Sequence, residues 1–153
     1  NSLISACSKC QQWQLSLHLL RGMSDAKVQK DKITYSSAIT SCDKQGQWLV
    51  ALDLLTEMEE AKVLPDTITY TASISSCEKG GAWQVALSLF RRMGEESMRR
   101  DAITYNSVIS ACAKGGQWAL ALHLIGAMAE ARVTKDTISY NAAISACDKA
   151  ERW

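Results

Sequence analysis

The residue types that could carry out chemistry recur along this chain at a constant interval of 35 residues. An aspartate occupies one such position and a lysine another, and no insertion shifts either series: Asp31, Asp66, Asp101 and Asp136; Lys9, Lys44, Lys79, Lys114 and Lys149. A carboxylate accepts hydrogen bonds, and an ammonium group binds anions. No Ser/His/Asp set, no pair of carboxylates and no phosphate-binding loop stands out, so we predict that the chain is not an enzyme.

The cysteines follow the same interval and predict free thiols. Five of the six are spaced in this way: Cys7, Cys42, Cys77, Cys112 and Cys147. Equivalent residues on packed helices lie about 8–10 Å apart, beyond easy disulfide reach. Cys7 and Cys10 form one CxxC, but a zinc site takes about four ligands, and His18 and His123 are three units apart. We therefore expect no metal, no cofactor and a reducing compartment.

Composition describes an ordinary globular chain. Its 153 residues are 47% apolar, and 17 basic residues against 16 acidic ones give a net charge of +1. No apolar stretch is long enough for a transmembrane helix, and no targeting peptide is visible in this window. The near-neutral charge argues against a strongly electrostatic polyanion binder. Five aligned lysines would still form a local positive stripe that the net charge conceals.

Trp, Tyr and Met share the 35-residue interval, and a fixed period of this size is typical of a solenoid. The tryptophans are Trp13, Trp48, Trp83, Trp118 and Trp153. If each unit closes at its Asp, the chain divides into one array of five units: 1–31 (partial), 32–66, 67–101, 102–136 and 137–153 (partial). Both ends then fall inside a unit, and we expect a window from a longer array.

Each unit is predicted to contain two helices. In unit 32–66, apolar residues from Tyr35 to Cys42 lie at i, i+3, i+4 and i+7, and a second stripe with this spacing runs from Trp48 to Met58. Gly46 interrupts the two, as suits the C-terminus of a helix. The sequence therefore predicts an all-α fold, a right-handed α-solenoid of 35-residue helix–turn–helix repeats.

The residues of the repeat resemble those of the pentatricopeptide repeat (PPR) family. The shared pattern is Ile-Thr-Tyr-Asn, then Ile-Ser-Ala-Cys-x-Lys-Gly-Gly, then Ala-Leu-x-Leu, Met and a closing Asp, and unit 102–136 matches it best. The resemblance covers the whole chain. The Trp stands where the family commonly has Leu, which is similar to a variant in some unicellular algae. Pro65 keeps the usual Pro before the closing Asp, whereas Lys30, Arg100 and Lys135 replace it elsewhere.

The resemblance implies binding of single-stranded RNA in an organelle, chloroplast or mitochondrion, at one nucleotide per repeat. It assigns base reading to the residue after each Tyr and to the closing Asp: Asn1 with Asp31, Ser36 with Asp66, Thr71 with Asp101, Asn106 with Asp136, and Asn141. It assigns an apolar clamp on the base to Ile33, Ile68, Ile103 and Ile138. The lysine series would contact phosphate. By the family's pairing pattern the complete pairs specify U-G-G-U from 5′ to 3′.

Other interpretations of the same residues remain open. Each closing Asp precedes a helix and could cap it, and each Lys could stabilise a helix C-terminus. The Trp series starts an amphipathic stripe, which favours packing between repeats over stacking on a base. The main alternative function is a protein-interaction scaffold, or an accessory subunit inside a large organellar assembly such as a ribosome or photosynthetic complex.

Overall fold

The computed structural model describes residues 3, 6 and 12–150, and within 12–150 it forms helices without strands. Asn1, Lys9, Cys7, Cys10 and Trp153 lie outside the described residues. The helices are α2 (Trp13–Asp25), α3 (Lys32–Asp43), α4 (Trp48–Glu60), α5 (Thr67–Gly80), α6 (Trp83–Glu95), α7 (Ala102–Lys114), α8 (Trp118–Glu130) and α9 (Thr137–Lys149). The predicted α-solenoid of helix pairs is therefore confirmed.

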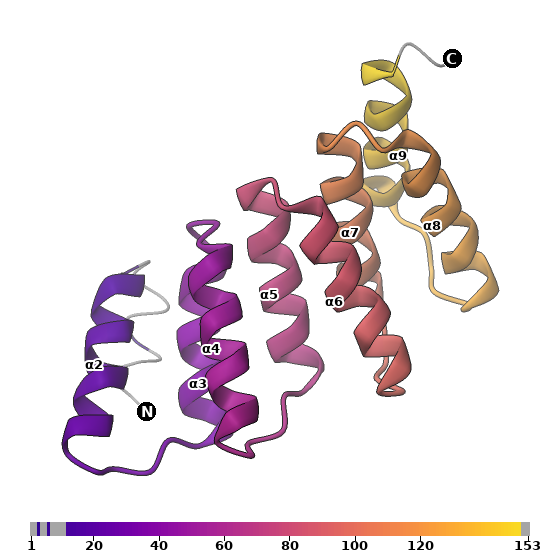
Figure 1. Cartoon of the computed structure of the whole chain (residues 1–153). Coiled ribbons are helices and arrows are strands. Elements are labelled where there is room, and N and C mark those ends of the chain that lie inside the picture. The colour runs from indigo at the N-terminus through magenta and orange to yellow at the C-terminus, as the bar shows by residue number, and fades with distance from the viewer. Residues whose placement is uncertain (1–2, 4–5, 7–11, 151–153) are drawn as a thin grey trace.

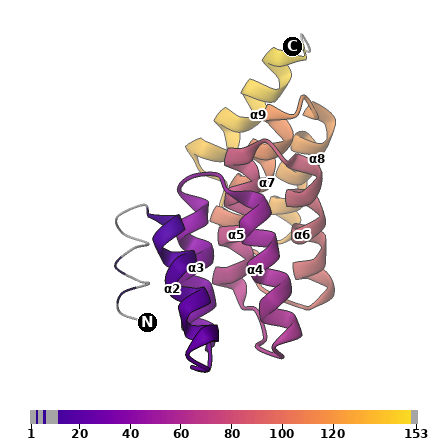
Figure 2. The same cartoon turned by 60° about the vertical axis from the view of Figure 1, so that its left-hand side comes forward.

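The helices form two layers that run from one end of the array to the other (Figure 1). The first helices of the units, α3, α5, α7 and α9, pack directly on one another in succession. The second helices α4, α6 and α8 each pack on the first helix of their own unit and on that of the next unit, and α2 packs on α3. No Cα atom of α4 lies within 8 Å of α6, nor any of α6 within 8 Å of α8. The turned view separates these layers (Figure 2).

Each first helix begins after an aspartate, and α3, α5 and α7 end near a glycine. Asp31, Asp66, Asp101 and Asp136 are the N-cap residues of the four first helices, which fits the preference for a short acidic side chain there. After α3, Gly46 has φ of +63°, a left-handed conformation that glycine adopts without a Cβ clash. The connectors use the same region at residues with side chains, as at Lys62 with φ of +58°.

The core follows the predicted stripes. Tyr70, Ile74 and Cys77 of α5 are fully buried, as are Ala86 and Met93 of the following α6. Equivalent positions are buried in the neighbouring helix pairs, so one continuous core runs between the layers. Burial decides how each helix is held, because a solenoid repeat buries its apolar face only against its neighbours.

The tryptophans pack between repeats, as the stripe pattern favours. Trp48 and Trp83 are half-buried and lie against the C-terminal turn of the next unit's first helix. A Cβ placed on Gly80 would lie 2.2 Å from Cδ1 of Trp48, and one on Gly115 would lie 2.2 Å from Cδ1 of Trp83. The Gly-Gly pair of the repeat therefore serves two purposes, since one glycine turns the chain and the other admits the indole ring.

Within the part of the chain that the structure describes, no helix is long and apolar enough to cross a membrane, and no three metal-ligating side chains gather.

Candidate nucleic-acid interface

Four isoleucines stand out from the surface of the first helices. Ile33, Ile68, Ile103 and Ile138 are 59%, 66%, 64% and 62% exposed. Each is the second residue of its helix, so the row repeats once per unit along one face. Single exposed apolar side chains are common, but these four occupy the same position in every described first helix, so they mark one face of the array. We call this surface the first-helix face.

In unit 102–136, the predicted base-reading pair is in direct contact. Nδ2 of Asn106 donates to Oδ1 and Oδ2 of Asp136 at 3.1 and 3.2 Å, across the boundary between α7 and α9. The hydroxyl of Ser139 lies 2.5 Å from Oδ1 of Asn106 and 3.0 Å from Oδ1 of Asp136, so its single hydrogen serves both oxygens. Asn106 is 7% exposed. The amide is thereby held in one orientation.

In unit 67–101, the pair is joined through a third side chain. The Thr104 hydroxyl donates to Oδ1 of Asp101 at 2.8 Å and lies 2.9 Å from the Thr71 hydroxyl. Because the one hydrogen of Thr104 goes to Asp101, the Thr71 hydroxyl must donate to Thr104. Thr71 and Asp101 line a groove of about 290 Å³ that also includes Ile68 and Ile103. The structure therefore brings a predicted reading pair and two predicted clamp residues to one groove.

The remaining predicted positions are arranged differently. Oγ of Ser36 donates to the backbone oxygen of Ile33 at 3.2 Å and not to Asp66. Asp66 instead has Nζ of Lys32 at 3.7 Å from its Oδ2. Asn141 is exposed on α9, and among the described residues its side chain has no hydrogen-bond partner. Two of the predicted pairs are thus brought together among the described residues.

The closing aspartates also cap their helices, so the two interpretations hold together. Oδ1 of each accepts the backbone N–H three residues later, for example from Thr69 to Asp66 at 2.9 Å. Burial alone would raise the pKa of Asp66, but hydrogen bonds from Thr69 and the charge of Lys32 hold it below its ordinary value. The N–H of Ser139, then its hydroxyl and the Asn106 amide, lower the pKa of Asp136. Both carboxyl groups are therefore ionised at neutral pH.

The lysines lie at the other end of the first helices, in or just after the last turn. Nζ of Lys79 is 2.9 Å from Oδ1 of Asp43, and Lys114 pairs in the same way with Glu78. Each pair joins one unit to the next. Lys44 and Lys149 are exposed, and among the described residues the structure shows no ion pair for either.

Sequence reasoning missed two sets of residues at this interface. One is the hydroxyl three residues after each closing Asp: Thr34, Thr69, Thr104 and Ser139. Its signal was visible, since Asp followed by Ser or Thr at this spacing is a capping pattern. The other set is the acidic residue just before the lysine, Asp43 or Glu78. Nothing in one unit indicates that it pairs with the lysine of the next unit.

The chain is similar to known protein families and to solved structures. A model described as a PPR repeat family matches residues 65–114, a pentatricopeptide repeat domain model matches residues 18–79, and a PPR repeat model matches residues 1–28 and 103–133. Together these matches run from residue 1 to residue 133. No curated protein sequence matches the chain.

Several solved structures share the fold. The PPR domain of Arabidopsis thaliana protein-only RNase P 1, in complex with tRNA, has a TM-score of 0.85 at 17% identity, covering 98% of this chain and 82% of that chain. PPR10 from maize, in complex with an 18-nt psaJ RNA element, has a TM-score of 0.80 at 24% identity, covering 97% and 22%. Nuclear proteinaceous RNase P 2 of A. thaliana has a TM-score of 0.82 at 12% identity, covering 94% and 33%. This chain thus spans about a fifth to a third of the latter two.

Proposed function

The chain belongs to the pentatricopeptide repeat family, and we propose that it binds single-stranded RNA along the first-helix face, with one nucleotide for each helix pair. The observation that carries the proposal is the groove of about 290 Å³ that Thr71 and Asp101 line together with Ile68 and Ile103. Two apolar side chains can hold the faces of a base, while the polar pair meets its edge. Two neighbours of the same fold were solved with RNA bound.

The hydrogen-bonding capacity left at Asn106 favours uracil. An Asn side chain has two N–H donors and an oxygen with two lone pairs. Asp136 takes one donor, and Ser139 takes one lone pair. One donor and one acceptor remain, and they complement the N3–H and a carbonyl oxygen of uracil. The base would approach between Ile103 and Ile138.

The capacity left at Thr71 favours guanine. Its hydroxyl hydrogen is committed to Thr104, so the Thr71 oxygen faces the groove as an acceptor. Oδ2 of Asp101 takes no part in the cap bonds to Thr104 and is a second acceptor. Two acceptors complement the N1–H and N2–H₂ donors of guanine. The two units therefore differ in the groups that they leave for a base. Asn106 leaves one donor and one acceptor, whereas Thr71 and Asp101 leave two acceptors.

With the family's pairing pattern for Asn1 with Asp31 and for Ser36 with Asp66, the suggested sequence is U-G-G-U. Units 1–31, 32–66, 67–101 and 102–136 would each contact one nucleotide, and unit 137–153 would begin a fifth through Asn141. Phosphates would be contacted by the lysine series. Lys79 and Lys114 would exchange a carboxylate of the neighbouring unit for a phosphate, whereas Lys44 and Lys149 are available directly.

The biological setting that we propose is organellar RNA metabolism, with this segment supplying recognition and no catalysis. Any cleavage or editing chemistry would belong to another part of a longer protein. A scaffold role in a large organellar assembly is the alternative, and it predicts a first-helix face that does not discriminate between RNA sequences.

The test is the affinity of the chain for fluorescently labelled RNA octamers that contain UGGU, its permutation GUUG, or adenine alone, measured by anisotropy at 50 and 200 mM salt. We expect the UGGU octamer to bind tightest and its affinity to fall with salt, with a logarithmic slope of about 0.7 per phosphate contacted. Equal affinity for the three RNAs, or no binding at 50 mM salt by a sample with a helical circular dichroism spectrum, would refute the proposal.

Lys79→Ala combined with Lys114→Ala tests the phosphate contacts separately. The double variant should weaken all three octamers alike and reduce the slope by about 1.4. Asp43→Asn is the matched control, because it breaks the Lys79 ion pair and leaves the lysine in place. An unchanged slope in the double variant would remove the lysines from the interface.

A further inference from the structure

A tyrosine, a cation and a carboxylate meet at the connector end of the first complete unit. The Tyr35 hydroxyl donates to Oε1 of Glu57 at 3.2 Å, and Nζ of Lys30 lies 2.5 Å from the same oxygen. These residues line a cavity of about 460 Å³ between α3 and the C-terminal end of α4. The carboxylate thus satisfies both donors within the chain.

The next unit builds the same trio from other positions. The Tyr70 hydroxyl donates to Oε1 of Glu96 at 3.0 Å, and Arg92 pairs with both Glu96 and Glu59, at 3.1 and 2.7 Å. Arg92 occupies the position that Glu57 holds one unit earlier. The cation and the carboxylate come from different positions of the repeat, yet tyrosine, cation and carboxylate are again in contact.

At the start of unit 102–136 the tyrosine and the cation are retained, but no such carboxylate is present. Tyr105 and Arg100 stand 70 residues after Tyr35 and Lys30, and Ala127 stands where Glu57 does. The positions that supply carboxylates in the second unit, Glu59 and Glu96, correspond to Gly94 and Ala131. The equivalent cavity is larger, about 630 Å³, and Tyr105, Arg100 and Ala131 line it. We call it the α6–α7 connector cavity.

Donors in this cavity lack acceptors. Nε of Arg100 is buried and has no hydrogen-bond partner among the described residues. Its guanidinium lies 4.1 Å from the centre of the Phe90 ring and donates through Nη2 to the Arg91 backbone oxygen at 3.2 Å, which fixes its place. The structure also shows no hydrogen bond for the Tyr105 hydroxyl within the described part of the chain. A buried donor without an acceptor is costly, so the cavity favours a ligand that supplies one.

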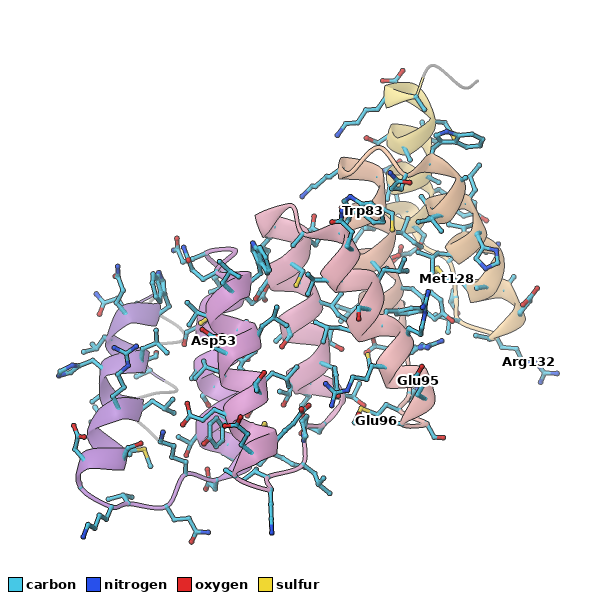
Figure 3. The ribbon with its side chains drawn as sticks, in the orientation of Figure 1. Asp53, Trp83, Glu95, Glu96, Met128 and Arg132 are labelled. Atoms are coloured by element: carbon cyan, nitrogen blue, oxygen red, sulfur yellow. The ribbon has the colours of Figure 1, made fainter. Side chains whose placement is uncertain are left out.

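The charged side chains around the cavity are mainly positive. Arg99, Arg100 and Arg132 line it, against Asp101, whose Oδ1 already accepts from the N–H and hydroxyl of Thr104. Met98 and Val133 add apolar surface. Figure 3 shows Arg132 at the connector end of the array with Glu95 and Glu96, away from Trp83. Neither glutamate lines the cavity.

We propose that the α6–α7 connector cavity binds an acidic segment of a partner protein. One carboxylate of that segment takes the place that Glu57 fills in unit 32–66. In both preceding units, a carboxylate of this chain accepts from the tyrosine hydroxyl and from a cationic side chain. The volume suits a short peptide segment, since ligand sites commonly enclose about 300–1,000 Å³. Ala102 and Tyr105 face the cavity at an i, i+3 spacing, whereas Ile103 and Asn106 occupy the first-helix face, so partner and RNA would contact different faces of α7. Asp101, the N-cap of α7, lies between the two faces and lines both the cavity and the groove.

The test follows the Arg100 Nε–H signal by NMR while acetylated, amidated triglutamate is added to the chain, with triglutamine and inorganic phosphate as parallel probes. We expect triglutamate to shift the signal saturably and triglutamine to leave it unchanged. Phosphate should bind at least tenfold more weakly than triglutamate. No shift with triglutamate, or phosphate binding as tightly, would overturn the proposal.

Two substitutions test the internal analogy. Ala127→Glu supplies the missing carboxylate and should weaken triglutamate binding at least tenfold, while Ala127→Gln, of the same size, should weaken it less than threefold. Glu57→Ala should create a second site and raise the stoichiometry from one to two. Equal weakening by Glu and Gln, or a stoichiometry that stays at one in Glu57→Ala, would contradict the carboxylate assignment. Binding of the UGGU octamer should not change in Ala127→Glu, which separates this site from the RNA face.

Discussion

Replacing Asn106 by Thr should convert the reading position of unit 102–136 into a copy of that in unit 67–101. At present the Asn106 amide donates to Asp136 and leaves one donor and one acceptor for a base. A threonine hydroxyl at this position would donate to Ser139, as Thr71 does to Thr104. Its oxygen would then be an acceptor only. The preferred fourth nucleotide should therefore change from U to G.

The size of the change follows from the hydrogen bonds exchanged. In the wild-type protein, a guanine would bring an N–H group against the remaining N–H donor of Asn106. In Asn106→Thr, a uracil carbonyl oxygen would lose the N–H donor that Asn106 supplies. A mismatched pair of this kind costs about 1–3 kcal/mol, so UGGU and UGGG affinities should each change by roughly 5- to 150-fold, in opposite directions. Loss of the bond from Asn106 to the Asp136 carboxylate should also lower the free energy of unfolding by about 1 kcal/mol.

The assay is anisotropy with the octamers containing UGGU, UGGG and UGUU, run beside urea denaturation of each variant. Thr71→Asn is the reciprocal control, and it should favour UGUU. An equal loss of affinity for every RNA would indicate damage to the fold. Retention of the UGGU preference by a stable Asn106→Thr variant would refute the hydrogen-bond reasoning itself.

Three further results are expected from the packing and the titrating groups. Gly115→Ala should lower the free energy of unfolding by about 1–3 kcal/mol, because its Cβ would lie 2.2 Å from Cδ1 of Trp83. Gly126→Ala, with nothing within 4 Å, should raise it by about 0.5–1 kcal/mol, and urea melts that rank the two alike would contradict this packing. Burial raises the pKa of Cys112 to about 11, so iodoacetamide at pH 8 should modify it far more slowly than the partly exposed Cys147, as peptide mass spectrometry would reveal. The folded-state pKa of Asp136 is depressed, chiefly by the Ser139 N–H, so its stabilisation is present above the ordinary value of about 3.9 and is lost as pH falls through the lower folded value. Asp136→Asn should flatten acid denaturation in that range, and unchanged curves would exclude this contribution.

Most of the fold was predictable because it depends on local pattern and period. The stripe from Tyr35 to Cys42 predicts α3, and the structure extends that helix from Lys32 to Asp43. The closing Asp could be assigned two roles from the sequence, and its capping role is confirmed by bonds such as Thr69 N–H to Asp66. Gly46 could be placed at a helix end because few other residues adopt positive φ there.

The rest depends on the register between neighbouring units, which a single unit does not contain. The hydroxyl chain from Thr71 through Thr104 to Asp101 forms because α5 and α7 approach closely at their N-terminal turns. The pairing of Lys79 with Asp43 likewise joins two neighbouring units, so the sequence of one unit does not indicate it. The cavity beside Arg100 could not be predicted from the sequence either, because no residue marks it. It results from what is missing at Ala127 and is recognisable only against a filled counterpart.

The unequal spacing of the two layers determines the curvature of the array. Neighbouring first helices have Cα atoms within 8 Å of one another, while no Cα atoms of α4 and α6, or of α6 and α8, come that close. The second helices are linked in part by long side chains, such as Arg92 to Glu59. An arc is shortest on its inside, so the isoleucine row lies on the inner radius. Straightening the array would pull the closely packed first helices apart. The helices α4, α6 and α8 have no such close contacts with one another to lose. We therefore expect the array to resist stretching more along its first-helix face than along the side formed by α4, α6 and α8.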